Sequence, residues 1–553
     1  MSRTTRAGVG GNSALVLVLL LMAAAALRVA STYTVFSETA DEHHFVAGLE
    51  WWDRGMYTYT IYHPPLARIA SALPLYLSGA RSHGLDDIVA EKNAILYSGI
   101  GYARNLALAR LGILPFLLLA ALLVWLWSRR LYGEGAGLAA ALLFSTLPPV
   151  LAHSGLTTTD APLMATLTWA LFAFCRWLET PTLVNGVLLG VSGGSAILSK
   201  FSAFPFFFWS AVAILLVRAA IGEAGPAERA GAASDRLRSL ACAAAVAALL
   251  IWAAYRFSWG TLPATTGPTG RTVLVGAGAS PATGIWIPAP EFWEGLRQIR
   301  ESVYLRGGHP SYLLGRYSLK GWWYYFPIAL AIKTPLAFLI LTAGGVAAAV
   351  GRMKTRKDWR ILAPIVASVA ILASSLFSRT DIGVRHILPI YPLLAIAAGC
   401  GVVKFWNAAR ARRAARVFLV ALMGWQVWVS IRAHPDYLAY FNELAGKHPD
   451  RILLDSNLDW GQDLYRLSDE LRRRGVDSLA LAYFGNADLT RHGLPPSRPL
   501  PPDHPTTGWI AISEMWLKDV AGGGKAYAWL RAREPVALVG KSIRLYYVPP
   551  AGD

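Results

Sequence analysis

The feature that most constrains this chain is a series of apolar runs, each near the length of a membrane span. A helix needs about 20 predominantly apolar residues to cross the hydrocarbon core of a bilayer. The runs predict an α-helical polytopic membrane protein with about eleven transmembrane helices. They are Ala14–Ala30, Leu106–Trp127, Ala136–Leu151, Ala161–Trp177, Leu183–Leu198, Phe204–Val217, Leu240–Tyr255, Trp323–Val350, Ile361–Phe377, Ile387–Val403 and Val417–Ile431.

The overall composition agrees with a membrane protein and excludes a soluble enzyme. Of the 553 residues, 54% are hydrophobic and only 16% are charged, which is far from the balance of a soluble domain. The formal net charge is +18, and the basic residues fall between the apolar runs. No recognised nucleic-acid-binding module is present. We therefore expect membrane lipids as partners and no nucleic acid.

The distribution of basic residues predicts the topology. Clusters such as Arg129-Arg130 and the stretch from Arg352 to Lys357 mark cytoplasmic loops by the positive-inside rule. With the N-terminus in the cytoplasm, the loops Ser31–Arg104 and Arg256–Trp322 and the C-terminus lie outside. We expect the first run to be retained as a span and not cleaved as a signal peptide, since it positions the charged residues that follow it. The predicted location is the inner membrane of a bacterial cell.

The amino-acid composition changes near residue 433. This change predicts a membrane domain (1–432) and a C-terminal domain (433–553). Apolar runs shorten after this point and charges return. Gln462–Arg474 has leucines on one helical face and ends at a glycine, so it predicts an amphipathic helix. These elements predict a small extracytoplasmic α/β domain. The predicted strands are Ile452–Leu454, Leu479–Phe484, Trp509–Ser513 and Ile543–Val548.

Asp41-Glu42-His43-His44-Phe45 follows the first apolar run, and His63-Pro64-Pro65-Leu66-Ala67-Arg68 comes about twenty residues later. On a helix, adjacent side chains diverge by about 100°, so the two carboxylates are not the pair that flanks one bond in glycosidases. One base beside a residue of another role fits better. Taken alone, the acidic pair also fits a solvated helix cap, and Arg68 fits either a phosphate site or an arginine snorkelling to the interface.

These two motifs resemble the first loop of protein O-mannosyltransferases. Those enzymes belong to the polyprenyl-phosphate-sugar-dependent glycosyltransferases of the GT-C fold, together with the aminoarabinose transferases that modify lipid A. Further matches follow in order along the membrane domain. They are Arg110, Thr158-Thr159-Asp160-Ala161-Pro162-Leu163, Lys200, Gly321-Trp322-Trp323-Tyr324-Tyr325-Phe326-Pro327, Lys333-Thr334-Pro335 and Gly383-Val384-Arg385-His386-Ile387-Leu388-Pro389.

The resemblance implies that Asp41 takes the proton of an acceptor hydroxyl, with Glu42 beside it in the catalytic site. The departing lipid phosphate then needs positive charge nearby. The candidates for that phosphate are Arg68, Arg110, Lys200 and Arg385. An alternative is that some of these cations sit at outer helix ends and pair with Asp160 or Asp381.

Three further residues are predicted to contact substrate. They are His63, Asp160 and His386. Asp160 also suits a helix N-cap, and the two roles are compatible. Glu42 and Asp160 would orient acceptor or sugar, or hold a divalent cation if one is used. No metal site follows from the spacing of Cys and His residues, and no cofactor is certain.

The segment Asp455–Asp463 carries five carboxylate or amide side chains and a Trp between a predicted strand and a helix. Its composition suits sugar hydroxyls or an N-cap cluster with a packed Trp, and the sequence assigns it no role. Tyr62 stands where protein mannosyltransferases usually carry an acidic residue, and the loop from Arg256 to Trp322 is too short for their β-trefoil module. The acceptor, whether protein, lipid or envelope glycan, therefore stays open.

The predicted function is an inverting glycosyltransferase that moves a sugar from a polyprenyl-phosphate carrier to an acceptor hydroxyl at the outer membrane face. A transporter or flippase of lipid-linked sugar is the alternative, because it would use the same intramembrane charges. A scaffold that only binds glycan would leave the Asp-Glu pair unexplained.

Overall fold

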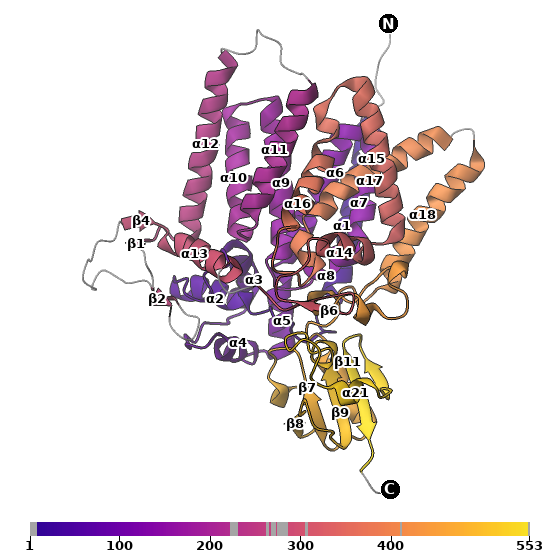
Figure 1. Cartoon of the computed structure of the whole chain (residues 1–553). Coiled ribbons are helices and arrows are strands. Elements are labelled where there is room, and N and C mark those ends of the chain that lie inside the picture. The colour runs from indigo at the N-terminus through magenta and orange to yellow at the C-terminus, as the bar shows by residue number, and fades with distance from the viewer. Residues whose placement is uncertain are drawn as a thin grey trace.

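The computed structural model describes residues 8–221, 231–261, 265–266, 272–273, 286–304, 308–409 and 412–550. Long helices form a bundle, short helices lie across one end of it, and a small β-sheet lies beyond them (Figure 1). α1 (Gly8–Ala30) starts at the end of the bundle away from the sheet. The bundle therefore has two distinct ends, and only one of them faces the sheet.

The bundle is built from helices that coincide with the predicted apolar runs. Within the described ranges, eight helices are long and apolar enough to cross a membrane, or nine if α7 and α8, bent by 64°, form one span. α10 and α16 are shorter, so the count of eleven spans stays a prediction. The remaining bundle helices are α6 (Leu114–Tyr132), α7 (Glu134–Ser145), α8 (Pro148–Ser154), α9 (Asp160–Glu179), α10 (Leu183–Ser199), α11 (Ala203–Ile221), α12 (Gly231–Ala254), α15 (Leu336–Arg356), α16 (Ala363–Ser375), α17 (Ile390–Ala408) and α18 (Arg413–Arg432).

Prolines divide two of the predicted runs. Pro148 and Pro149 open α8 after the bend from α7. The single span expected over Trp323–Val350 consists of α14 (Tyr325–Lys333) and α15, with Pro335 between them. Proline lacks the backbone N–H that a continuous helix requires, so the chain breaks at these places.

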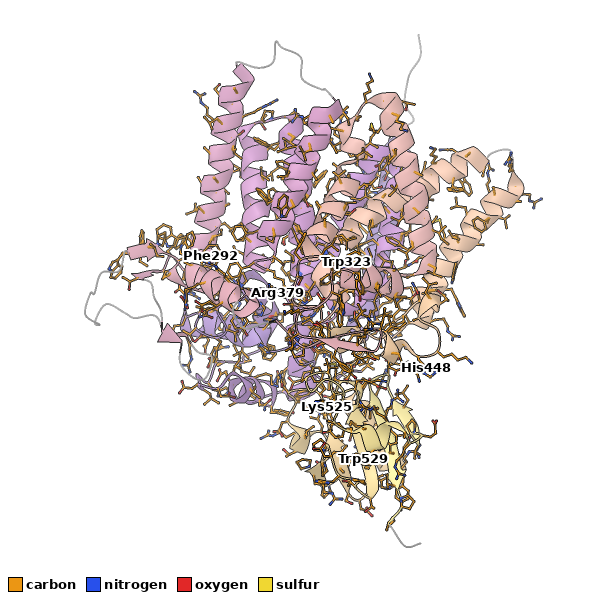
Figure 2. All side chains as sticks on the ribbon, viewed as in Figure 1. Phe292, Trp323, Arg379, His448, Lys525 and Trp529 are labelled. Carbon is orange, nitrogen blue, oxygen red and sulfur yellow. The ribbon has the colours of Figure 1, made fainter. Side chains whose placement is uncertain are left out.

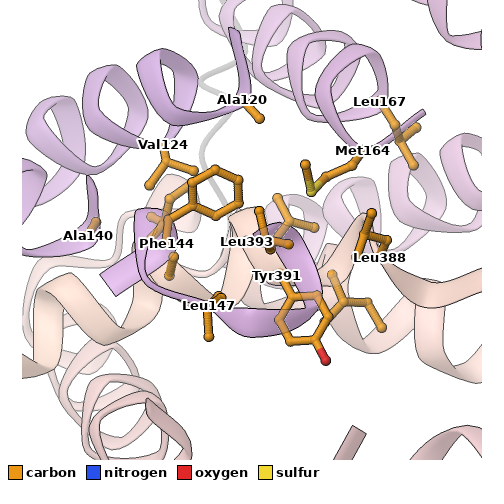
Figure 3. Close-up of a cluster of buried hydrophobic side chains, with 14 of the residues drawn as sticks. Ala120, Val124, Ala140, Phe144, Leu147, Met164, Leu167, Leu388, Tyr391 and Leu393 are labelled. Carbon is orange, nitrogen blue, oxygen red and sulfur yellow. The ribbon is translucent and has the colours of Figure 1, made fainter. Parts of the chain in front are cut away.

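The core of the bundle lies where α6, α7, α9 and α17 meet. Val124, Phe144, Met164 and Leu393 come from these four helices and contribute to one buried cluster (Figure 3). Gly399 of α17 allows a close approach, because a Cβ atom there would lie 2.4 Å from the carbonyl oxygen of Ala136. Small residues of this kind let membrane helices pack closely.

Short elements cover the sheet-facing end of the bundle. They include α2 (His44–Arg54), α3 (Leu66–Leu77), α4 (Ile88–Leu96), α5 (Tyr102–Leu111), α13 (Pro290–Tyr304), and the strand pairs β1 (Trp259–Thr261) with β4 (Trp286–Pro288), β2 (Thr265–Thr266) with β3 (Thr272–Val273) and β5 (Ser311–Leu313) with β6 (Arg316–Ser318). Phe45 of α2, Leu75 of α3 and Phe292 of α13 share a second apolar cluster, and Figure 2 marks Phe292 at this level. The first loop is therefore a packed platform.

The sheet at the far end has five strands in the order β10-β11-β9-β7-β8. β7 (Leu479–Ala482) runs parallel to β8 (Ser497–Pro499) and β9 (Gly508–Ser513), whereas β11 (Ile543–Val548) is antiparallel to β9 and to β10 (Ala537–Val539). α19 (Leu464–Arg473) buries Leu464, Leu467 and Leu471 against the sheet.

The predicted helix and three of the four predicted strands in this region are confirmed within one or two residues. The strand expected at Ile452–Leu454 is wrong: the segment forms turns, with one bridge between Leu453 and Leu313. β8 and β10 were not predicted, because each has only three residues. The boundary at residue 433 stays a prediction.

Candidate active site

Asp41 lies between α1 and α2, at the end of the bundle that faces the sheet. Its carboxylate Oδ2 accepts a hydrogen bond of 2.9 Å from Nη2 of Arg385. The Asp41 side chain is 38% exposed, whereas that of Arg385 is 8% exposed. Asp41 therefore offers an accessible carboxylate oxygen next to a buried cation.

Asp160 and Lys200 complete a cluster of two acids and two cations. Asp160 begins α9 and is buried, and its Oδ1 accepts a 2.6 Å bond from Nζ of Lys200. Its Oδ2 lies 3.5 Å from Nη1 of Arg385. Lys200 follows the end of α10, and Arg385 lies in the short 3-10 helix η3 (Val384–Ile387).

The cluster therefore joins residues from four separate elements. From the sequence, pairing with Asp160 is the alternative to phosphate binding by Lys200 and Arg385. The structure shows the pairing, and a paired cation can still bind a phosphate. Buried ions require partners of opposite charge to be tolerated. The two carboxylates neutralise the two cations in this structure. An entering anion could bind the cations if it displaced the carboxylates from these pairs.

His63 and His386 are the two predicted substrate-binding histidines. The Nε2 atom of His386 is buried and has no hydrogen-bond partner in the described residues. The His63 ring packs edge-on against the ring of His44, with centroids 4.6 Å apart. Burial holds the pKa of both imidazoles well below the usual range, and the nearby cation Lys200 lowers each pKa further. Both rings are therefore neutral at pH 7.

Glu42 and Arg110 form a separate buried pair. Nε and Nη2 of Arg110 donate to the two oxygens of the Glu42 carboxylate at 2.9 and 2.6 Å. The other bonds of the guanidinium go to the carbonyl oxygens of Tyr33, Phe36 and Ser37. Glu42 also accepts from the backbone N–H groups of Thr39 and Thr157. The pair fixes the backbone on the N-terminal side of Asp41.

Arg68 is buried within the first loop. Its Nη1 donates to the hydroxyl of Tyr57 and to the carbonyl oxygens of Tyr59 and Thr60, and its Nη2 donates to the Thr60 hydroxyl. The phosphate-binding role expected of Arg68 and Arg110 stays a prediction. Their N–H groups are already used by the loop, and both side chains are almost fully buried.

Removing the charge of Glu42 is expected to destabilise the fold. Glu42→Gln leaves Arg110 as a buried charge without its partner, and breaking such a pair costs about 3–5 kcal/mol in the free energy of unfolding. Thermal unfolding in detergent would measure it. Glu301→Gln is the matched control, because Glu301 pairs with Arg297 at an exposed site and such pairs contribute about 1 kcal/mol or less. Equal effects of the two substitutions would contradict the assignment.

Asp455 gives the region a pH-dependent stability. Burial raises the pKa of its carboxyl group to about 6, although Arg385 opposes the shift. Because this pKa is higher than in the unfolded chain, the folded state loses stability as pH rises through about 4 to 6. Asp455→Asn keeps an acceptor for the N–H of Ser456 and tolerates the positive φ of 56°.

Asp455→Asn is therefore expected to be more stable than the original chain at pH 8, and the difference should shrink as pH falls below about 6. Thermal unfolding of both proteins between pH 4 and 8 would measure it. A difference that is the same at all pH values would show that the Asp455 carboxyl group does not titrate in this range.

Sequence reasoning missed two residues of the site. Ser456 accepts a hydrogen bond from Arg385, and the ring of Trp460 packs on the same guanidinium. The sequence singled out their segment but gave no signal of this contact. In the described part of the chain, no three His, Cys, Asp or Glu side chains are grouped so as to hold a metal ion.

The comparisons with known proteins agree with this architecture. Residues 104–226 match the family model described as dolichyl-phosphate-mannose-protein mannosyltransferase, a segment that contains Asp160 and Lys200. The structure of the S. cerevisiae protein O-mannosyltransferase Pmt1-Pmt2 complex bound to the sugar donor is similar, with a TM-score of 0.53 and 13% identity, over 79% of this chain and 90% of that chain.

Two structures of ArnT from Cupriavidus metallidurans are also similar. The form bound to undecaprenyl phosphate has a TM-score of 0.49 and 13% identity, over 96% of this chain and 97% of that chain. The apo form has a TM-score of 0.48 and 16% identity, over 79% and 68%. No curated protein sequence matches significantly. The expected resemblance is confirmed: the chain has the GT-C fold, with a sheet-containing C-terminal region.

Proposed function

We propose that this chain, a membrane protein of the GT-C fold with a mannosyltransferase-like segment, is an inverting glycosyltransferase that uses a polyprenyl-phosphate sugar as donor. The observation that carries the proposal is the accessible Asp41 carboxylate, held 2.9 Å from Arg385 in a cluster with Lys200. A base for the acceptor hydroxyl and cations for the donor phosphate are the two requirements of this transfer.

The proposed reaction is a single displacement. Asp41 accepts the proton of the acceptor hydroxyl, and the acceptor oxygen forms a bond to the anomeric carbon of the sugar. The bond between that carbon and the phosphate oxygen breaks, and its electron pair leaves with polyprenyl phosphate. Arg385 and Lys200 neutralise the charge that develops on the phosphate. Attack from the side opposite the phosphate inverts the anomeric centre.

Donor binding and activation of the base are linked in this mechanism. Without donor, a guanidinium nitrogen of Arg385 occupies one oxygen of the Asp41 carboxylate. A donor phosphate competes for the same guanidinium. As Arg385 turns to the phosphate, the Asp41 carboxylate is released to accept the proton of the acceptor hydroxyl.

The other predicted residues support this centre. Asp160 orients Lys200 and Arg385. His63 and His386, as neutral rings, are available for hydrogen bonds with sugar hydroxyls. Glu42 with Arg110, and Arg68 within its loop, hold the platform that carries Asp41, in place of contacting phosphate.

The proposed location of the reaction is the outer face of a bacterial inner membrane. The basic ends of α6 and α15, with Arg129-Arg130 and Lys354, lie at the end of the bundle away from the sheet (Figure 1). The positive-inside rule assigns that end to the cytoplasm. The cluster and the sheet are then outside, where a protein, lipid or glycan acceptor would meet the donor.

An assay of donor consumption tests the proposal. Purified protein is incubated with radiolabelled polyprenyl-phosphate sugars and cell-envelope acceptors, and free polyprenyl phosphate is measured. We expect its release in step with transfer of the label. A transporter or flippase would move the lipid across vesicles without consuming it, and no observation favours that alternative. Failure to consume any donor would refute the proposal.

A further inference from the structure

The segment from Ser456 to Gln462 connects the bundle to the sheet, and it contacts Arg385 and the backbone just before Asp41. Ser456 is fully buried, and Trp460 is 1% exposed. Neither side chain has a role in the proton transfer or the displacement described above. Their contacts nevertheless converge on Arg385 and on the residue before Asp41.

The guanidinium of Arg385 is held on its face and on its edges. Its Cζ atom lies 4.3 Å from the centroid of the Trp460 ring. Its Nε donates to the Ser456 hydroxyl at 3.0 Å, and that hydroxyl donates to the carbonyl oxygen of Ile382 at 2.8 Å. The two terminal nitrogens contact Asp41 and Asp160. This set of contacts suits a flat guanidinium with several N–H groups and does not suit the ammonium of a lysine.

The same segment also holds the backbone that carries the base. The N–H of Ala40 donates to the carbonyl oxygen of Trp460 at 2.9 Å, and the N–H of Ser37 donates to that of Gln462 at 3.1 Å. The Gln462 side chain accepts from the N–H of Trp460 at 2.8 Å. Trp460 therefore contacts the Arg385 cation through its ring, and it contacts the backbone of Ala40, which precedes Asp41, through its carbonyl group.

We infer that Trp460 and Ser456 are positioning residues that set the place of Arg385 relative to Asp41. A stacked ring restricts the guanidinium to one plane, and the Ser456 hydroxyl fixes its rotation within that plane. Both terminal nitrogens then point toward the carboxylates, where the donor phosphate would bind. This inference rests on the proposed function, because the phosphate is the group that Arg385 is held ready to receive.

A purely structural role for Trp460 makes a different prediction. Its ring also lies near that of His153, with centroids 6.2 Å apart, so a core function alone would lower stability. Such a loss would not depend on the side chain at position 385. The two roles are therefore separated by combining substitutions at Trp460 and Ser456 with Arg385→Ala.

The experiment uses the full chain in detergent, with Trp460→Leu, Trp460→Phe and Ser456→Ala, each alone and combined with Arg385→Ala. Binding of a short-chain polyprenyl phosphate is measured by calorimetry, and kcat and KM are measured by donor consumption. Trp529→Leu is the control, since Trp529 lies in the sheet region far from the bundle (Figure 2). Thermal unfolding verifies that each protein is folded.

We expect Trp460→Leu to weaken polyprenyl phosphate binding and to lower kcat/KM by about 10-fold or more, and Ser456→Ala by about 3- to 10-fold. Trp460→Phe keeps an aromatic face and should stay within about 3-fold. In the Arg385→Ala background, none of these changes should have a further effect above about 2-fold, because the group that they position is gone. Trp529→Leu should leave both quantities unchanged.

The inference is overturned if Trp460→Leu and Ser456→Ala change neither quantity, or if their losses add in full to that of Arg385→Ala. If Trp460→Leu does not fold, Ser456→Ala decides by the same criteria. If the chain consumes no donor, the proposed function fails, and the binding measurements alone still decide whether Trp460 positions Arg385. If the chain binds no polyprenyl phosphate, the inference fails as well.

Discussion

Asp41→Asn is expected to lower the rate of sugar transfer by about 100-fold or more, the usual cost of losing a general base. The amide has nearly the same shape as the carboxylate but cannot take the acceptor proton. Arg385 keeps its contact with Asp160, so the protein should fold. Donor consumption at saturating acceptor is the measurement, and kcat should fall much more than the affinity for donor.

Asp53→Asn is the matched control for this substitution. Asp53 lies in the same first loop, on α2, and its ion pair with Arg81 is long, at 3.5 Å, and exposed. Its amide can still accept from the N–H of Ser82, as the carboxylate does. We expect less than about a 2-fold change. Asp41→Asn with more than a third of the original rate would exclude Asp41 as the base.

Arg385→Ala is expected to have the second large effect, a loss of about 100- to 1,000-fold in kcat/KM. This is the range seen when one group that stabilises developing charge is removed. Because the same guanidinium would bind the ground-state phosphate, the KM for donor should also rise. Arg385→Lys should recover only part of the loss, since an ammonium cannot contact Asp41, Asp160 and Ser456 in the geometry of the fork.

Arg379→Ala provides the comparison for a surface arginine. Arg379 is exposed and lies six positions before Arg385, near the sheet-facing end of the bundle (Figure 2). We expect its removal to leave kcat/KM within about 2-fold. Similar losses for the two alanine variants would mean that net positive charge near the membrane surface, and not the position of Arg385, supports transfer.

The helices of this fold were predictable because a membrane imposes a length and a composition on each span. Their breaks were harder to predict. The division at Pro335 and the bend between α7 and α8 interrupt stretches that remain apolar throughout. The count of spans depends on α10 and α16, which are apolar but shorter than the long apolar helices of the bundle.

Part of the candidate site could be anticipated where a residue type and its motif both carried information. Asp41 lies in the motif of the first loop, and Arg385 lies in the motif just before α17. The two residues are 344 positions apart, and the structure brings them together. For Arg68 and Arg110, the motifs did not indicate which groups the side chains would contact. Their partners are mostly backbone carbonyl groups and loop hydroxyls, which leave no pattern in the sequence.

Ser456 and Trp460 illustrate a second limit. Their segment had an unusual composition, but the contact with Arg385 depends on how the chain after α18 folds back over the end of the bundle. Local periodicity contains no information on such a return. Only the tertiary structure distinguishes a Trp packed in a core from one that also lies on a buried guanidinium.

The most direct test of the account is a structure of this chain with a polyprenyl phosphate bound. We predict phosphate oxygens within about 3.5 Å of Arg385 and Lys200, with the bond between Arg385 and Asp41 broken and the Asp41 carboxylate facing the vacated position of the sugar. A phosphate bound by other cations, with Asp41 and Arg385 still joined, would contradict the account.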